Sequence, residues 1–377
     1  MDIAARIDHA VAAALEDKRV VGSVVIVKRD GETLHRRAAG LANRETGRTM
    51  QPDAIFRLSS LTKPIVATTV LAMAERGLLR LSDPVTRYLP DFRPKLADGS
   101  APDITLQHLI THTAGLGPMP PLFEDERTDP EFLAVGLDRW HLSLERNLAR
   151  LMRVPLQFAP GVGWAYSAGI DVLGAVAATL VGGTLGDAVA TYVTGPLGMG
   201  DTRFSVTDVS RLAAPYADGP EGPVLMGDPH EVANPRGGIT TYYPGLILDP
   251  KAYHAGGGGM AGTADDFMTL LEMLRTGGGA ILSPQMLAEG AADQLAADVH
   301  QSPGWKFGYF GAVLVDPVLA ESPQSVGTYR WGGIYGHSWF IDPAEELSVV
   351  AMTNTGLEGS DGRFPIDIRN AVYGRNH

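Results

Sequence analysis

The residues best suited to chemistry in this sequence are Ser60 and Lys63, which form a Ser-x-x-Lys motif. Residues three positions apart share one face of a helix, so the hydroxyl and the amine can meet if a helix begins here. A serine hydroxyl is a weak nucleophile until a base removes its proton. A lysine amine can be that base once burial favours its neutral form. The pair predicts a nucleophilic serine, although one spacing of two common residue types also occurs by chance.

The residues around this motif predict that Ser60 lies at the start of a helix. Ile55–Leu58 has the character of a short strand, and apolar residues recur at helical spacing after the motif. Pro64 belongs in a first helical turn, because proline lacks an N–H and clashes with the carbonyl four residues before it. Gly77 supplies a stop. Free backbone N–H groups at such a start favour developing negative charge.

Other residues that could do chemistry have weaker patterns. No acidic partner lies at an obvious spacing from His112, so we expect a structural histidine bonded to nearby backbone rather than a general base. Ser167 and Ser338 do not complete the Gly-x-Ser-x-Gly motif of another hydrolase fold. His337 is expected to be structural or to lie near the active site. The glycine run Gly256–Gly262 has no Gly-Lys-Ser/Thr after it, so close backbone packing explains it better than a phosphate loop.

Composition narrows the function classes. The chain has 377 residues, no cysteine, and a net charge of −12, which argues against nucleic acid and anionic membrane surfaces as partners. Without cysteine there is no disulfide, thiolate metal site or cysteine nucleophile. The first 17 residues predict an amphipathic helix rather than a signal peptide, and the apolar run Val172–Val181 is too short to span a bilayer. We expect a cytoplasmic enzyme without metal or cofactor, unless an export signal has been removed; the oligomeric state stays open.

Strand patterns gather at both ends of the chain. Val20–Lys28 and Glu32–Ala39 read as strands joined by a hairpin at Asp30-Gly31, and the region of about 60–200 is mainly helical. The later expected elements are the strands Phe307–Val315, Gly327–Gly333, Gly336–Ile341 and Leu347–Met352 and the closing helix Pro365–Tyr373.

This order predicts one α+β unit over 1–377, with an antiparallel sheet built from both termini and flanked by terminal helices. The α/β layer would cover about 1–58 and 245–377, and a mainly helical subdomain about 59–244. Ser60 would lie in a cleft between the layers. We expect the loops Pro118–Asp129 and Pro215–Pro250 to wall the substrate site.

Three motifs together resemble those of a known superfamily. Ser60–Lys63, then Tyr166-Ser167-Ala168, then Trp331-Gly332-Gly333 follow the motif order of the serine β-lactamases and penicillin-binding proteins. The sequence resembles most closely one branch, the family VIII carboxylesterases with a class C β-lactamase fold. Segments 109–116, 196–202 and 331–340 also look like that branch, so the resemblance covers nearly the whole chain.

The resemblance implies a role for each matching residue. Ser60 would be the acylated nucleophile, and Lys63 its base or the group that keeps the base deprotonated. Tyr166 would share proton transfer with Lys63, and the residue that takes the first proton stays open. The backbone N–H groups of Ser60 and Ile334 would form the oxyanion hole. The implied pocket residues are Trp331, Gly332 and Gly333.

Two departures from the β-lactamase pattern shape the predicted function. Ala168 stands where β-lactamases carry asparagine, and Trp331-Gly332 stands where they carry Lys-Thr. Both changes remove partners of a β-lactam substrate, so neutral esters fit better. We predict a serine carboxylesterase that hydrolyses short-chain or small neutral esters through an acyl-enzyme on Ser60, with little or no β-lactamase activity. The alternatives are an acyltransferase of the same fold, a β-lactamase or penicillin-binding protein, and a non-catalytic binding protein.

Overall fold

A computed structural model gives the structure of the protein and describes residues 2–116, 144–233 and 239–375. Its main feature is a sheet of eight antiparallel strands in the order β10-β11-β12-β13-β14-β1-β2-β3. The strands are β1 (Gly22–Arg29), β2 (Glu32–Asn43), β3 (Arg48–Thr49), β10 (Trp305–Phe307), β11 (Ala312–Leu314), β12 (Tyr329–Gly333), β13 (His337–Asp342) and β14 (Leu347–Thr353). Strands from both ends of the chain therefore share one sheet, which confirms the predicted α+β architecture.

Helices fill most of the remaining chain. The longer ones are α1 (Ile3–Glu16), α2 (Thr62–Glu75), α4 (Leu144–Leu151), α5 (Gly169–Val181), α8 (Ala264–Arg275), α9 (Pro284–Ala291) and α11 (Arg363–Tyr373). The short ones are α3 (Leu106–Ile110), α6 (Leu185–Val189), α7 (Gly195–Leu197) and α10 (Gly356–Ser360). Small two-stranded sheets pair β4 (Phe56–Arg57) with β9 (Ala261–Gly262), β5 (Tyr216–Ala217) with β6 (Val224–Leu225), and β7 (His230–Ala233) with β8 (Ile239–Tyr242).

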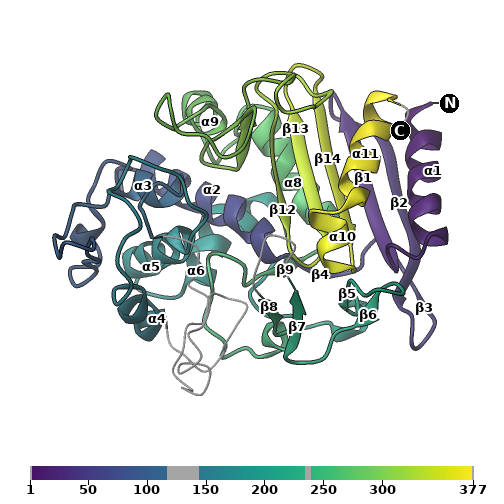
Figure 1. Ribbon diagram of the computed structural model, residues 1–377, viewed down its shortest axis with the longest axis horizontal. Helices are drawn as coiled ribbons and strands as arrows, with labels where there is room; N and C mark the ends of the chain where they lie inside the picture. Colours follow the sequence, from purple (N-terminus) through teal and green to yellow (C-terminus); the bar gives the residue numbers. More distant parts are fainter. Residues whose placement is uncertain (1, 117–143, 234–238, 376–377) are drawn as a thin grey trace.

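The large sheet separates two hydrophobic cores. Successive side chains of a strand point to opposite faces, and in β1 the side chains of Val24 and Ile26 join the core that contains α2, α5 and α8. Val25 and Val27 join the core that contains α1 and α11. Figure 1 shows α1 and α11 side by side over one face of the sheet, with both chain termini there. The terminal helices thus cover the sheet as predicted, and α2 lies on its other side.

Several local expectations need correction. The strand predicted over Phe307–Val315 is two strands, β10 and β11, because the chain turns between Gly308 and Gly311, where the Gly308 N–H donates to the Gly311 carbonyl over 2.8 Å. Alternating apolar residues cannot reveal a turn that two glycines make possible. Within the region predicted to be mainly helical, α6 is followed directly by a π-helical turn, Ala190–Thr194. The hairpin at Asp30-Gly31 is confirmed.

The predicted division into an α/β layer and a helical subdomain stays a prediction. The loop predicted over Pro118–Asp129 lies outside the described residues. Among the described helices none is long and apolar enough by itself to cross a membrane, and one bent pair, Gly169–Val181 with Leu185–Leu197, passes such a test only on its combined length and composition.

Candidate active site

Ser60 lies in a tight turn immediately before α2. The turn is one segment of 3₁₀ helix, Ser59–Leu61, and α2 begins at Thr62, so the helix starts within two residues of the predicted position. Ser59 has a φ of +50°, a left-handed conformation that is uncommon for residues with a side chain. The Leu58 N–H donates to the Met260 carbonyl over 2.8 Å, which fixes the turn against the segment that leads into β9. Ser60 itself is half-buried and lies near the positive end of α2.

Lys63 reaches back from the first turn of α2 to this serine. Its Nζ donates to Ser60 Oγ over 3.2 Å and to the carbonyl oxygen of Gly257 over 2.5 Å. The same ammonium lies 4.6 Å from the centroid of the Tyr166 ring, within the range of a cation–π interaction. Three neighbours therefore hold one lysine head group next to the serine hydroxyl.

Tyr166 completes the polar cluster from the segment before α5. Its hydroxyl donates to Ser60 Oγ over 2.7 Å. The residues on both sides of Tyr166 are fixed by His112: the Ala165 N–H donates to the His112 carbonyl over 3.0 Å, and the Ser167 N–H donates to His112 Nδ1 over 3.2 Å. The structure thus brings Ser60, Lys63 and Tyr166 together, residues that the sequence places in two separate motifs.

His112 is bonded to nearby backbone, in the manner expected of a structural histidine. It is fully buried, and its ring centroid lies 4.8 Å from that of Tyr166. Burial, with a smaller effect of the Lys63 cation, lowers the pKa of His112 well below its usual 6.5. The imidazole is therefore neutral near pH 7, and its Nδ1 serves as a hydrogen-bond acceptor.

Trp331 extends the site into an aromatic wall. Its indole N–H donates to the Tyr166 hydroxyl oxygen over 3.3 Å. Its rings lie 5.3 Å from Tyr166 and 5.1 Å from Phe307, and Phe307 in turn contacts Trp164. The spacing and tilt of these rings fit the edge-to-face and offset contacts that aromatic pairs prefer. Apolar ring surface therefore lies beside Tyr166, the residue whose hydroxyl contacts Ser60.

The glycines after Trp331 face in opposite directions. A Cβ built on Gly333 would lie 2.6 Å from the Leu58 carbonyl oxygen, so β12 passes directly against the turn that carries Ser60. Ile334 follows, and its carbonyl accepts from the Tyr242 hydroxyl over 3.2 Å. A Cβ on Gly332 would instead approach His337 and Ser360, away from that turn. Gly333 thus lies against the turn that carries Ser60, whereas the places of Gly332 and Ile334 in the site stay predictions.

The rival serines are placed less favourably for nucleophilic attack. Ser167 Oγ lies 3.2 Å from His112 Nδ1, but its residue is only 8% exposed. Ser338 shares a sheet face with Phe340 in the core beneath α11, whereas Trp339 points to the side of α2.

His337 supports the strand leading to the nucleophile. Its Nε2 is 2.7 Å from the Arg57 carbonyl oxygen, and burial lowers its pKa to about 4. His337 is therefore neutral near pH 7, and Nε2 carries the proton that it donates to Arg57.

Sequence reasoning missed part of this neighbourhood. Asp171 and Gly257 form the second layer behind Lys63, and Trp164 and Phe307 belong to the aromatic wall. One signal was available: Asp171 is the one charged residue in the sequence of α5, and an unpaired carboxylate is rarely buried. The glycine run does serve close packing: Gly256 lies against the first turn of α5, and Gly258 lies against the Ser59 turn.

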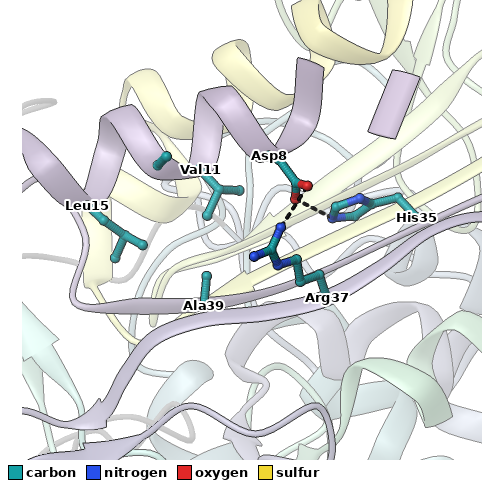
Figure 2. A pocket seen from close by; sticks show the side chains of 7 residues that line it. Asp8, Val11, Leu15, His35, Arg37 and Ala39 are labelled. Carbon is teal, nitrogen blue, oxygen red and sulfur yellow. Dashed lines mark hydrogen bonds and ion pairs between the residues drawn. The ribbon is translucent and has the colours of Figure 1, made fainter. Parts of the chain in front are cut away.

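A separate cavity lies on the other face of the sheet, between α1 and β2 (Figure 2). At one end Arg37 donates to Asp8 over 2.7 Å, with His35 beside them. The cavity is lined by Asp8, Val11, Ala12, Leu15, His35, Arg37 and Ala39. None of the motif residues lines it, so it is distinct from the candidate active site.

Comparison with known proteins identifies the family to which the chain belongs. The sequence model of the family described as Beta-lactamase matches residues 7–372. The chain belongs to this Beta-lactamase family. It is 48% identical to "Esterase EstB" of Burkholderia gladioli over 379 residues, which cover 99% of this chain and 96% of that protein. The serine cluster therefore lies in a family member with a closely similar esterase relative.

Solved structures agree with the family assignment. The structure of "EstCE1, a hydrolase with promiscuous acyltransferase activity" has a TM-score of 0.95 and 41% identity, and the match covers 99% of this chain and 98% of that one. Simvastatin synthase (LovD) from Aspergillus terreus has a TM-score of 0.76 at 22% identity, covering 99% and 98%, which bears on the fold alone. These findings confirm the predicted β-lactamase-type fold and the resemblance to its esterase members.

Proposed function

We propose that this Beta-lactamase family member is a serine carboxylesterase of the family VIII type that hydrolyses short-chain or small neutral esters. The observation that carries the proposal is the position of Ser60 Oγ, 2.7 Å from the Tyr166 hydroxyl and 3.2 Å from Lys63 Nζ, in a chain 48% identical to an esterase. A nucleophile within hydrogen-bond reach of two groups that can exchange protons with it has what acyl transfer requires. The catalytic roles below are part of this proposal.

In the first step Ser60 Oγ attacks the ester carbonyl and forms a tetrahedral intermediate. The single proton of the hydroxyl passes to the Tyr166–Lys63 pair, and the new oxyanion accepts hydrogen bonds from the N–H groups of Ser60 and Ile334. The C–O bond to the alcohol then breaks, and the alcohol leaves with a proton from the same pair. In the second step water attacks the acyl-enzyme, gives its proton to the pair, and releases the carboxylic acid and free Ser60.

The surroundings of Tyr166 favour neutral substrates. The motif position where β-lactamases carry lysine holds Trp331, so an indole rather than a second ammonium lies against the phenol. Its apolar face offers packing to an acyl chain or alcohol and no charge to a substrate carboxylate. Ala168, only 4% exposed, offers no amide to a β-lactam side chain. We therefore propose that β-lactam rings are poor substrates.

The test is hydrolysis of p-nitrophenyl butyrate by the wild type, Ser60→Ala and Ser338→Ala. Ser338 is the matched control because it is a half-buried serine on the face of the sheet opposite α2. We expect Ser60→Ala to lose at least about 10³-fold in kcat/KM with an unchanged thermal midpoint, and Ser338→Ala to keep wild-type activity. Equal activity of Ser60→Ala and the wild type would refute the proposal.

Acyl transfer to alcohols is a second candidate function, favoured by the likeness to EstCE1, whose description includes acyltransferase activity. Water and an alcohol would use the same acyl-enzyme, so the two functions differ only in the acceptor. The ratio of acid to new ester in the presence of added alcohol separates them, and acid alone would remove the transferase function. A cephalosporin carrying a side-chain ester tests the third alternative: release of the ester group with an intact ring supports the esterase, and rapid ring opening supports a β-lactamase.

Location and partners stay at the level of prediction. We propose a small-molecule ester as the partner of the site and the cytoplasm as the location, on the sequence arguments alone. Sedimentation and cell fractionation would test oligomeric state and location directly.

A further inference from the structure

Asp171 is a buried carboxylate that the mechanism above does not use. It lies in the first turn of α5, five residues after Tyr166, and it is 6% exposed. Its neighbours along the helix are apolar or glycine, so the surrounding sequence gives no reason for a charge. A buried carboxylate destabilises the fold unless hydrogen bonds or an opposite charge compensate it.

A single residue, Gly257, connects this carboxylate to Lys63. The Gly257 N–H donates to Asp171 Oδ1 over 3.2 Å, while the carbonyl of Gly257 accepts from Lys63 Nζ over 2.5 Å. One residue therefore receives its orientation from Asp171 on one side and orients Lys63 on the other. Because the Gly257 carbonyl accepts from Lys63 Nζ, a fixed Gly257 backbone also fixes the position of the Lys63 ammonium.

The packing around Gly257 shows how closely the two charges approach. A Cβ built on Gly257 would lie 2.5 Å from Asp171 Oδ2 and 3.5 Å from Lys63 Nζ. The ammonium and the carboxylate are thus no farther apart than the sum of these two distances. A side chain at this position would displace one of them, which accounts for the glycine.

Electrostatics supports an interaction between the two groups. Burial raises the pKa of Asp171, and this effect is opposed by the Lys63 cation and by the backbone N–H groups of Gly257 and Gly256. The other titratable groups of this neighbourhood are the Tyr166 phenol and His112, which is held neutral. Among the residues that the structure describes, Lys63 is the cation that acts on Asp171.

We propose that Asp171 is a positioning residue for Lys63: its carboxylate fixes the Gly257 backbone that receives the ammonium, and its charge favours the protonated form of the Lys63–Tyr166 pair. The inference rests on the proposed function, because it concerns the proton acceptors of Ser60. Asp171 acts through Lys63 and is not assigned a contact with substrate. A variant that removes the charge of Asp171 but keeps its hydrogen bond favours the deprotonated form of the Lys63–Tyr166 pair. In such a variant the rise of kcat/KM with increasing pH therefore moves to lower pH.

The experiment compares the wild type with Asp171→Asn, Asp171→Ala and Asp266→Asn in p-nitrophenyl butyrate hydrolysis across pH. Asp266 is the matched control, because it also lies in the first turn of a helix, accepts a backbone N–H, that of Asp201, over 2.9 Å, and has a pKa raised by burial. The carboxamide of Asp171→Asn still accepts from Gly257. We expect the low-pH limb of kcat/KM to move down by about 0.5–2 pH units for this variant, from the interaction of unit charges about 6 Å apart.

The remaining variants separate charge from geometry. Asp171→Ala loses the acceptor as well, so we expect kcat to fall by about a further tenfold with little change in KM. Asp266→Asn should keep the wild-type profile. A pH profile of Asp171→Asn that superimposes on that of the wild type, or that moves to higher pH, would overturn the inference. A purely structural residue would change the stability of the protein but not the position of the low-pH limb of kcat/KM.

A second measurement does not depend on the ester substrate or on a single variant. A fluorophosphonate probe releases no alcohol and needs no water step. Ser60 Oγ forms a bond to phosphorus, the P–F bond breaks to release fluoride, and the serine proton passes to the Lys63–Tyr166 pair. Its labelling rate against pH should show the same downward movement in Asp171→Asn, or in Asp171→Ser if the former fails to fold. Failure of wild-type ester hydrolysis would refute the proposed function, whereas unchanged labelling profiles in an active enzyme would refute the role of Asp171 alone.

Discussion

The hydroxyl of Tyr166 donates to Ser60 Oγ over 2.7 Å, although 106 residues separate the two in the chain. The contact joins the segment before α5 to the turn before α2, so it depends on how those two elements pack. His112 holds the residues on both sides of Tyr166, and the ring contacts Trp331. The phenol oxygen is thus placed by a packed shell rather than by local sequence.

Tyr166→Phe tests the phenol oxygen without removing the ring. The phenyl group keeps its contacts with His112 and Trp331. We expect kcat for p-nitrophenyl butyrate to fall by about 10²–10⁴-fold, the usual contribution of a proton-transfer group. Tyr309→Phe is the control, because its hydroxyl is bonded to Glu289 instead. Retention of more than a tenth of wild-type kcat in Tyr166→Phe would show that Lys63 alone suffices.

Trp331→Phe tests the indole N–H that donates to the Tyr166 oxygen. A phenyl ring keeps most of the apolar wall but loses this hydrogen bond, for which about 1 kcal/mol is typical. We expect kcat to fall by about fivefold with a smaller change in KM. Trp305→Phe, in which the altered ring lies under Arg330, serves as the comparison. A change confined to KM would assign Trp331 to substrate packing only.

Whether a contact in the site could be predicted depends on how far apart its two residues lie in the sequence. Ser60 and Lys63 are three residues apart, so helical geometry alone brings them together. The position of Tyr166 is predictable only from the order of the motifs and the resemblance to a family, since no local rule places a residue 106 positions away. The hydrogen bond between Tyr166 and Ser60 agrees with the prediction from the motif order.

The same limit explains what was missed in the sequence. The link from Asp171 through Gly257 to Lys63 joins α5, the glycine run and α2, and each partner looks ordinary in its own segment. The large sheet was predictable because alternating apolar residues at both termini must pair to bury one face. The division of one expected strand into β10 and β11 was not, because it depends on a glycine turn that periodicity does not register.

Gly333→Ala tests the approach of β12 to the nucleophile turn. The new Cβ would lie 2.6 Å from the Leu58 carbonyl oxygen, a backbone atom that cannot move without shifting Ser60. We expect kcat/KM to fall by about 10²–10³-fold, as for the loss of one oxyanion donor. The matched control is Gly200→Ala, whose Cβ would meet nothing within 4 Å. Equal activity of the two variants would exclude a role for this approach in catalysis.

His337→Gln tests the pH dependence of stability. Burial lowers the pKa of His337 to about 4 in the folded protein, whereas an unfolded histidine titrates near about 6.5. Above the higher value both states are neutral. As pH falls from there to about 4, only the unfolded state takes up this proton, so the free energy of unfolding falls by about 3 kcal/mol.

Glutamine can still donate to the Arg57 carbonyl but does not titrate, so this loss should be absent from His337→Gln. His112 acts in the same direction in both proteins, because burial also lowers its pKa. Urea unfolding of wild type and variant at several pH values between 7.5 and 4.5 isolates the effect of His337. We expect the stability advantage of the wild type over the variant to shrink as pH falls. Parallel curves would show that His337 does not titrate differently in the folded and unfolded states, and His337→Asn provides a second variant if glutamine does not fit.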